Sequence, residues 1–345
     1  MKLFSKKIGL AVVVCSLLLL GYFNKALLIH HIFALNSHHL LVNQPESPYY
    51  LSADVITFSY DRPMQLYAFL ESIEKHVSGQ GKMYVVYRVS SAEYKKGYSE
   101  VQKRFPEVVF LEQGDSLENN FKSLVLQAIK DSPSDFLIFA VDDDIITSKI
   151  DISHSVKAMI DHRAYAFLFR MGNNIMYSNR NTPLKIPYQT IPEEDMRLWV
   201  VKNGQEAWHY VHNVDFSMYS KKEILPVLEN LSFIAPNSFE EAWNRVCFVS
   251  LFGRLKDWTK FNFKKCLCYS KSKLINIPIN LVNEEIVNPN LSQSHYSKEA
   301  LLSLFFDGVT IDVDAYHEYF PQTVHVMIDP QFNLSGSKGS FCVEK

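Results

Sequence analysis

Hydrophobic residues in the first half of the chain form short continuous runs that alternate with stretches of helical spacing. Four apolar runs are typical of buried strands, at 54–59, 82–89, 108–111 and 135–141. Between them, apolar residues recur every three or four positions near 63–77 and 121–129, as they do along one face of a helix. Strands alternating with helices predict an α/β fold with a mostly parallel, Rossmann-like sheet flanked by helices.

The second half of the chain is less regular. Helical spacing predicts four helices, at 152–162, 221–228, 239–251 and 297–306. Strand-like runs occur at 164–171, 199–201, 207–211, 214–219 and 274–279. This pattern predicts a mixed α+β half that follows the more regular first half.

The N-terminus begins with Lys2, Lys6 and Lys7 and continues with an uncharged apolar segment at 8–23. A basic start followed by such a segment favours an uncleaved, single-pass membrane anchor at 1–25, with a stem or linker at 26–52; a signal peptide that is removed is the alternative. The lysines favour a cytoplasmic N-terminus, but Lys25 on the other flank leaves the side of the membrane open.

One folded domain is expected at 53–330, followed by a flexible tail at 331–345. The sequence is 47% hydrophobic and 21% charged, which is enough apolar material for a sizeable core. The net charge of -2 offers no basic field for nucleic acid, so no nucleic-acid partner is expected.

Three adjacent carboxylates, Asp142, Asp143 and Asp144, follow directly after the apolar run at 136–141. They repel one another unless they are solvated, capped by backbone N–H groups or neutralised by a divalent cation. Ligands of open α/β sheets bind beyond the carboxyl ends of the strands. The triplet therefore predicts a site for a metal and a diphosphate, with a turn or cap cluster as the alternative.

Several segments together resemble the GT-A fold glycosyltransferases, in particular a family-2-like, poorly characterised bacterial-type group. The first strand and helix (VITFSYDRP at 55–63) and the FAVDDD motif at 139–144 are similar to the nucleotide-binding strand and the Asp-x-Asp motif of that family. Further similar segments lie at 169–173, 214–219, 236–240 and 277–284. The resemblance covers about 54–310, and 216–219 lacks the glycines of the family pattern, which leaves the acceptor side open.

The resemblance implies a glycosyltransferase that moves a sugar from a nucleotide-diphosphate donor to a hydroxyl group of an unidentified glycan, lipid or protein. It also implies Mn²⁺ or Mg²⁺, bound by Asp142 and Asp144, because a divalent ion neutralises the leaving diphosphate. Asp143 is expected to orient the loop or to contact the sugar. A histidine late in such chains completes the metal shell, and His295 fits best by position.

Four further residues are expected on the nucleotide side. By resemblance, Asp61 and Arg62 line the nucleotide pocket, with a helix cap and a surface arginine as the alternative. Arg88 ends a predicted strand and could bind a phosphate with two hydrogen bonds, or form a surface salt bridge. Lys122 opens a predicted helix and could reach the nucleotide, or lie on a solvated helix face.

An inverting transfer needs a carboxylate that removes the proton of the acceptor hydroxyl. Glu240 is the first candidate, followed by Glu241 and Asp215; the two glutamates begin a predicted helix, where acidic residues are favoured in any case. Two other functions stay open: a catalytically silent carbohydrate-binding or scaffold protein on the same fold, and a nucleotidyltransferase. The absence of a glycine-rich phosphate loop after the first strand argues against the nucleotidyltransferase.

Overall fold

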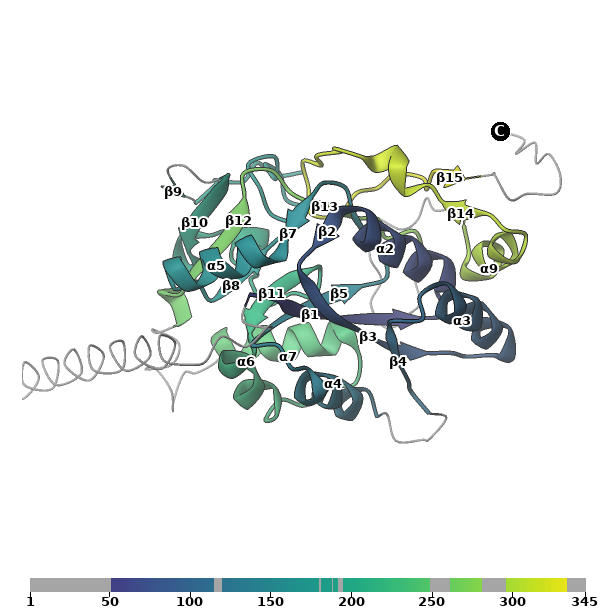
Figure 1. Cartoon of the computed structure of the whole chain (residues 1–345). Helices are drawn as coiled ribbons and strands as arrows, with labels where there is room; N and C mark the ends of the chain where they lie inside the picture. The colour runs from purple at the N-terminus through teal and green to yellow at the C-terminus, as the bar shows by residue number, and fades with distance from the viewer. Residues whose placement is uncertain are drawn as a thin grey trace, which may run out of the picture. The chain divides into compact units, whose positions relative to one another are not determined.

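A nine-stranded sheet forms the centre of the described chain (Figure 1). The computed structural model describes residues 51–114, 120–179, 181–187, 189–191, 195–248, 261–280 and 296–333. No helix in these ranges is both long and apolar enough to cross a membrane. The anchor expected at 8–23, the stem and His295 lie outside the described residues.

Four strands form the parallel part of the sheet. In spatial order they are β4 (Val109–Glu112), β3 (Gln80–Arg88), β1 (Ala53–Tyr60) and β5 (Phe136–Val141). The segments between them are helical, which is the connection that parallel neighbours require. The carboxyl ends of β1 and β5 consequently lie next to each other at one edge of the sheet.

Beyond β5 the strand directions are mixed. The order continues with β11 (Ser217–Ser220), β8 (Ala166–Leu168), β12 (Lys265–Tyr269), β10 (Met196–Val200) and β9 (Gln189–Thr190). Strand β11 runs antiparallel to both β5 and β8, whereas β12 and β8 are parallel. The antiparallel direction brings the residues just before β11 to the same edge as the carboxyl end of β5.

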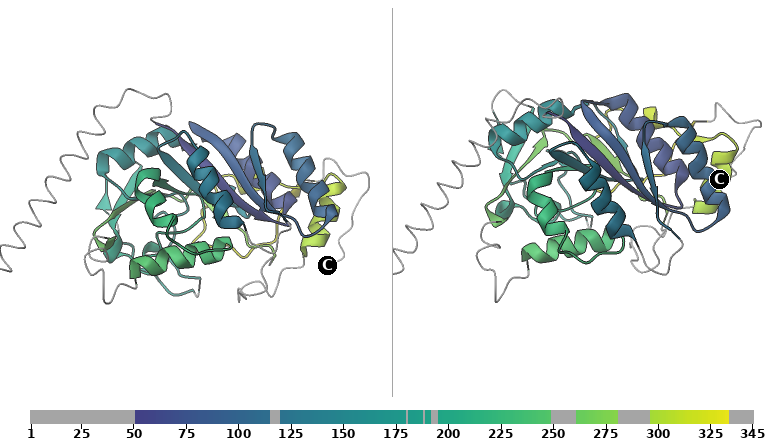
Figure 2. Two further views of the ribbon diagram at one scale, coloured as in Figure 1. Left: turned by 90° about the horizontal axis from the view of Figure 1, so that it is seen from below. Right: turned by 60° about the horizontal axis from the view of Figure 1, so that its bottom comes forward.

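Two layers of helices cover the faces of the sheet, as Figures 1 and 2 show from different sides. One core contains side chains of α2 (Pro63–His76), α3 (Ala92–Arg104), α5 (Ile152–His162) and α9 (Lys298–Phe306). The other contains side chains of α4 (Phe121–Asp131), α6 (Lys221–Leu228) and α7 (Pro236–Phe248).

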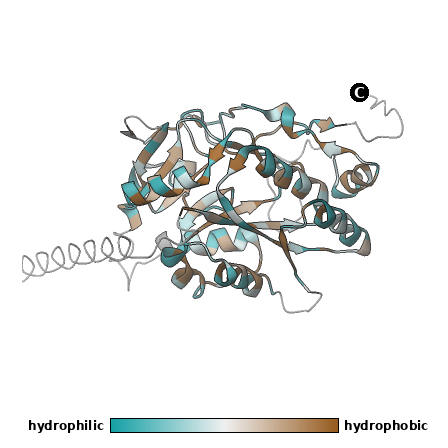
Figure 3. Ribbon diagram, viewed as in Figure 1, coloured by the Kyte–Doolittle hydropathy of each residue, from teal (hydrophilic) through white to brown (hydrophobic). Residues whose placement is uncertain are grey.

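Residues of the central strands alternate between these two cores. In β1, Val55 packs on the side of α2, and Ile56 and Phe58 pack on the side of α4. In β5, Ile138 packs on the side of α2 and Phe139 on the side of α4. Both faces of the sheet are therefore covered, which explains the hydrophobic central strands in Figure 3 and the continuous apolar runs in the sequence.

The second half departs from the pattern expected of it in several places; for example, β12 of the main sheet was not expected. The strand expected at 207–211 is instead a short 3-10 helix, η2 (Glu206–Trp208), followed by irregular chain. The segment expected as a tail begins with β15 (Phe332–Asn333), which pairs with β14 (Thr310–Ile311). The rest of that segment, from 334 onwards, lies outside the described residues.

Candidate functional site

The aspartate triplet lies where β5 ends and the chain turns into β6 (Asp144–Ile146). Asp142 is 3% exposed and Asp144 is fully buried, so neither carboxylate belongs to a solvated turn. Asp144 is the first residue of β6 and pairs with Asn276 across the antiparallel ladder to β13 (Leu274–Asn276). The triplet is thus held between the main sheet and a separate two-stranded ribbon.

Arg62 connects the end of β1 to the triplet. Its Nη1 lies 3.0 Å from Oδ1 of Asp142 and 3.3 Å from Oδ2 of Asp143. The other side of the guanidinium donates to Asn280, from Nε to the side-chain oxygen at 3.0 Å and from Nη2 to the backbone carbonyl. Arg62, which we expected in the nucleotide pocket, therefore lies beside the triplet and partly neutralises it.

A second acidic group reaches the triplet from the start of the antiparallel strand. Asp215 precedes β11, and its Oδ2 forms an ion pair of 2.8 Å with Nη1 of Arg170. Arg170 is 6% exposed, and its Nε has no hydrogen-bond partner among the described residues. The side-chain amide of Asn276 donates to Asp143, Asp144 and the Oδ1 of Asp215, so it bridges the two acidic groups.

The two glutamates of α7 lie beyond its first turn, not at its start as the sequence suggested, and they have different environments. Glu240 turns inward and accepts a hydrogen bond of 2.7 Å from the backbone N–H of Val214 and one of 3.4 Å from the hydroxyl of Tyr210. Glu241 points outward, and its half-exposed carboxylate pairs with Arg245 one turn later. Of the two, only Glu240 is brought to the acidic cluster, and its carboxylate caps the segment before Asp215 instead of its own helix.

His325 joins the cluster from the C-terminal part of the chain. Its Nδ1 lies 2.7 Å from the side-chain oxygen of Asn276, and the backbone N–H of Val326 donates to the carbonyl of the same asparagine. Burial, followed by the charge of Arg170, lowers the pKa of His325 to about 4, so the ring is neutral near pH 7. No sequence pattern around His325 pointed to this position.

Negative charge is in excess in this cluster, which we define as Asp142, Asp143, Asp144, Asp215 and Glu240. Among the residues that the structure describes, two guanidinium groups, those of Arg62 and Arg170, make ion pairs with these five carboxyl groups. Burial raises the pKa of Asp142 to about 6, against the opposing charge of Arg62.

The pKa values of two other members of the cluster, Asp144 and Glu240, are also raised. Burial and then the neighbouring Asp215 and Asp143 raise the pKa of Asp144 well above its usual range. Burial and then Asp215 raise the pKa of Glu240 to about 8. Buried carboxylates held this way take up protons or a cation in order to reduce their mutual repulsion.

The donor set fits a hard divalent cation. Carboxylate oxygens are the ligands that Mg²⁺ and Mn²⁺ prefer, and a neutral imidazole suits Mn²⁺ as well. In the described ranges, no three side chains of His, Cys, Asp or Glu are already gathered around one point in metal-binding geometry. The carboxylates of the triplet instead accept hydrogen bonds from Ser59, Arg62 and Asn276.

Asp61 and Arg88 lie at the neighbouring ends of β1 and β3. Asp61 has a positive φ of 53° and is fully buried. Its carboxylate accepts hydrogen bonds from the backbone N–H and hydroxyl of Ser90, and Lys298 lies 3.1 Å away. The guanidinium of Arg88 stacks over the ring of Tyr60, with 5.2 Å between the guanidinium carbon and the ring centroid. The structure thus places Asp61 and Arg88 together where the neighbouring strands β1 and β3 end. Neither of them contacts the triplet in the hydrogen bonds and ion pairs described above.

Lys122 lies in the first turn of α4 and contacts the segment after α6. Its Nζ donates to the backbone carbonyls of Glu229, at 2.9 Å, and Leu231, at 2.5 Å. The ammonium also lies 5.9 Å from the ring centroid of Phe233. These contacts hold two helices together, which is a structural role that the sequence did not suggest.

Replacing Lys122 with methionine should lower the free energy of unfolding by about 1.5–3 kcal/mol, because hydrogen bonds from a charged donor are lost. Nucleotide affinity should stay unchanged. Lys130→Met is a matched control on the same helix: its exposed ion pair with Glu229 should contribute no more than about 1 kcal/mol. Chemical denaturation and nucleotide titration of both variants check this, and a loss of nucleotide affinity in Lys122→Met alone would return Lys122 to the nucleotide side.

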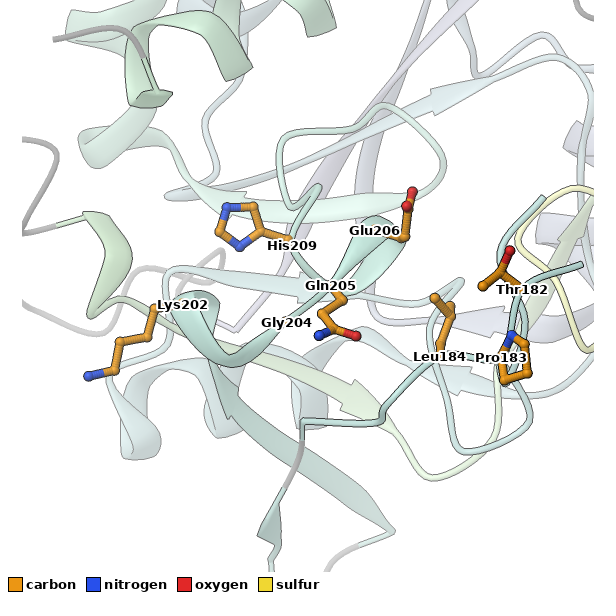
Figure 4. A pocket seen from close by; sticks show the side chains of 8 residues that line it. All are labelled: Thr182, Pro183, Leu184, Lys202, Gly204, Gln205, Glu206 and His209. Atoms are coloured by element: carbon orange, nitrogen blue, oxygen red, sulfur yellow. The ribbon is translucent and has the colours of Figure 1, made fainter. Parts of the chain in front are cut away.

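An open hollow lies beside the segment that leads to Asp215 (Figure 4). Lys202, Glu206 and His209 form its polar wall, and Pro183 and Leu184 form its apolar wall. Gly204 also lines it; a Cβ there would lie 2.3 Å from the carbonyl oxygen of Trp208, so no side chain fits.

No known family and no curated protein matches this sequence. Among solved structures, the chain is similar to residues 1–349 of TarS from S. aureus, with 13% identity and a TM-score of 0.42 over 65% of this chain and 59% of that one. It is also similar to a mannosyltransferase from Pyrobaculum calidifontis with bound GDP-Man and Mn²⁺, with 10% identity and a TM-score of 0.34 over 60% of this chain and 57% of that one.

A UDP-glucose pyrophosphorylase with bound UDP-glucose is a third similar structure, with 10% identity and a TM-score of 0.33 over 65% of this chain and 92% of that one. This chain spans less than two thirds of the TarS fragment and of the mannosyltransferase. At these identities and TM-scores, the likeness carries no argument about the reaction. The proposal below therefore rests on the geometry of the site and on the sequence motifs.

Proposed function

We propose that the protein is a glycosyltransferase that moves a sugar from a nucleotide-diphosphate donor to a hydroxyl group of an acceptor. One observation carries the proposal: the buried carboxyl groups at the carboxyl ends of the parallel strands outnumber their guanidinium partners among the described residues, so not all of them can ionise unless a cation binds. That edge is where open α/β sheets bind ligands. The excess charge is what a cation bridging to a diphosphate would offset.

Asp142 and Asp144 would hold Mn²⁺ or Mg²⁺, and His325 is a further candidate for the histidine ligand, beside His295, which lies outside the described residues. When bound, the ion acts as a Lewis acid that stabilises the charge on the leaving diphosphate. Asp143 keeps the loop in place through its hydrogen bond with Asn276. Arg62 already pairs with two of the carboxylates, so it can help to orient the triplet while it adds positive charge near the phosphates.

Glu240 is the best-placed base for an inverting transfer. Its carboxyl group is buried, and burial raises its pKa to about 8, close to the operating pH at which a general base is most effective. Asp215 is the second candidate: burial raises the pKa of its carboxyl group, and the ion pair with Arg170 opposes that rise. On the nucleotide side, the group around Asp61 and Arg88 lies at the ends of β1 and β3. A membrane anchor at 8–23 remains part of the proposal.

The test is a donor screen with purified full-length protein, in which UDP- and GDP-sugars are incubated with and without Mn²⁺. We expect Mn²⁺-dependent release of the nucleoside diphosphate from at least one donor, by slow hydrolysis if the acceptor is absent. Release of pyrophosphate from a nucleoside triphosphate and a sugar phosphate would instead identify a nucleotidyltransferase. Binding of sugars with no turnover of any donor would identify a silent carbohydrate-binding protein, and either result would overturn the proposal.

A further inference from the structure

Asn276 occupies the centre of the acidic cluster. It is the last residue of β13, is 3% exposed, and lies directly opposite Asp144 in the ladder to β6. Its side-chain nitrogen is 2.9 Å from Oδ1 of Asp143, 3.1 Å from Oδ1 of Asp144 and 3.4 Å from Oδ1 of Asp215. One neutral amide thus contacts carboxylates from two separate segments of the chain.

The opposite end of the same amide contacts His325. Because the carboxylates accept hydrogen bonds, the nitrogen of Asn276 must face them, and its oxygen then faces Nδ1 of His325 at 2.7 Å. An amide oxygen only accepts, so Nδ1 of His325 must carry the hydrogen. In a neutral imidazole the lone pair is then on Nε2. The orientation of one asparagine therefore fixes the tautomer of the histidine.

We propose that Asn276 is a positioning residue that aligns the carboxylates of the cluster and holds His325 in the tautomer with a lone pair on Nε2. This inference rests on the proposed function, because the aligned groups are those that would hold the cation. The role requires a side chain that donates hydrogen bonds and carries no charge of its own. A lysine here would neutralise the cluster, and an aspartate would add repulsion and remove both N–H donors.

The side chain and the backbone of Asn276 have separable roles. The backbone carbonyl accepts a hydrogen bond of 2.9 Å from Val326, and the next backbone N–H, that of Ile277, donates to the carbonyl of Asp143 at 2.9 Å. These two bonds join β13 to the C-terminal segment and to the triplet, and they do not need the amide. Asn276→Ala removes the amide and leaves both in place.

The test uses full-length protein with ¹⁵N-labelled histidine, in which the ring nitrogens of His325 are assigned by comparison with His325→Gln. In the unsubstituted protein we expect a protonated Nδ1 and a lone pair on Nε2. In Asn276→Ala, we expect the other tautomer to become the major form. Mn²⁺ affinity, measured by calorimetry, should fall about 10–100-fold, as it does when a group that orients a metal ligand is removed.

Asn276→Asp keeps the shape of the side chain and separates the contact with His325 from the hydrogen bonds to the carboxylates. A carboxylate oxygen can still accept from Nδ1 of His325, so the tautomer should stay as in the unsubstituted protein while the donors to the carboxylates are lost. If Asn276→Ala does not fold, this variant still tests whether the side chain of Asn276 sets the tautomer of His325. A change of tautomer in Asn276→Asp would overturn the proposed contact with His325.

Asn174→Ala is the matched control. Its amide is also hydrogen-bonded at both ends, to Ser272 and Pro321, but touches none of the carboxylates. It should leave the tautomer of His325 and the Mn²⁺ affinity unchanged.

An unchanged tautomer in Asn276→Ala would refute the positioning role. If the unsubstituted protein binds no Mn²⁺, the proposed function fails by that result, whereas the tautomer of His325 still decides the role of Asn276.

Discussion

Asp144→Asn is expected to abolish Mn²⁺-dependent binding of the nucleotide-diphosphate donor while the protein stays folded. Asp144 is fully buried and is close enough to Asp143 and Asp215 for their charges to raise its pKa. The substitution removes one negative charge and one oxygen ligand, and the remaining amide is a far weaker ligand for a hard cation. We expect a loss of at least about 100-fold in Mn²⁺ affinity, since changes in groups that merely orient a ligand already cost 10–100-fold.

Isothermal titration of Mn²⁺ and UDP or GDP measures this loss, and circular dichroism checks the fold. Asp161→Asn is a matched control: Asp161 is half exposed and pairs with Lys157 on the surface of α5. It should bind the ion and the nucleotide as the unsubstituted protein does. Mn²⁺ affinity that is unaltered in Asp144→Asn would show that the triplet does not hold the cation.

Glu240→Gln should lower kcat by about 100-fold or more and leave donor affinity near that of the unsubstituted protein, because base catalysis typically contributes that much. Glutamine keeps the size of the side chain and still accepts the hydrogen bond from Val214, but it cannot take a proton. Glu241→Gln is the matched control one residue along, since Glu241 is exposed and paired with Arg245. Equal kcat values in the two variants would remove Glu240 from the mechanism and leave Asp215 as the candidate.

The stability of the same variant depends on pH. The pKa of Glu240 is raised from 4.5 to about 8 by burial and then by Asp215, so the folded protein favours the protonated form. Its contribution to stability is fully present below about pH 4.5 and is lost as the pH rises through about 8. Glu240→Gln should therefore gain in melting temperature relative to the unsubstituted protein as the pH rises from about 5 to about 8. A difference that does not change over this range would contradict the raised pKa.

The four strands and two of the helices of the parallel part could be predicted from the sequence because their patterns are local; α3 was not expected. In β1 and β5, side chains alternate between two covered faces, which leaves an apolar run that is visible without the fold. The run at 207–211 was wrongly expected to be a strand. Trp208 and Val211 are buried, but a sharp turn with a positive φ at Glu206 takes them into the core without any strand partner.

The sequence named Asp142, Asp144, Asp215 and Glu240 as candidates, and the structure brings them into one cluster with Arg62, but their roles stay predictions. Asn276 and His325 were missed because their roles depend on which segments meet in space. An asparagine that ends a short strand and a histidine in an irregular segment have no local signal that marks them. Only the ladder between β6 and β13 makes Asn276 the neighbour of Asp144.

A crystal grown with Mn²⁺ and UDP or GDP, with anomalous diffraction measured at the manganese edge, tests the central claim most directly. The account predicts one anomalous peak between the carboxylates of Asp142 and Asp144 and the diphosphate, with His325 on the same side. A nucleotide bound elsewhere on the protein, or a peak away from the triplet, would contradict it.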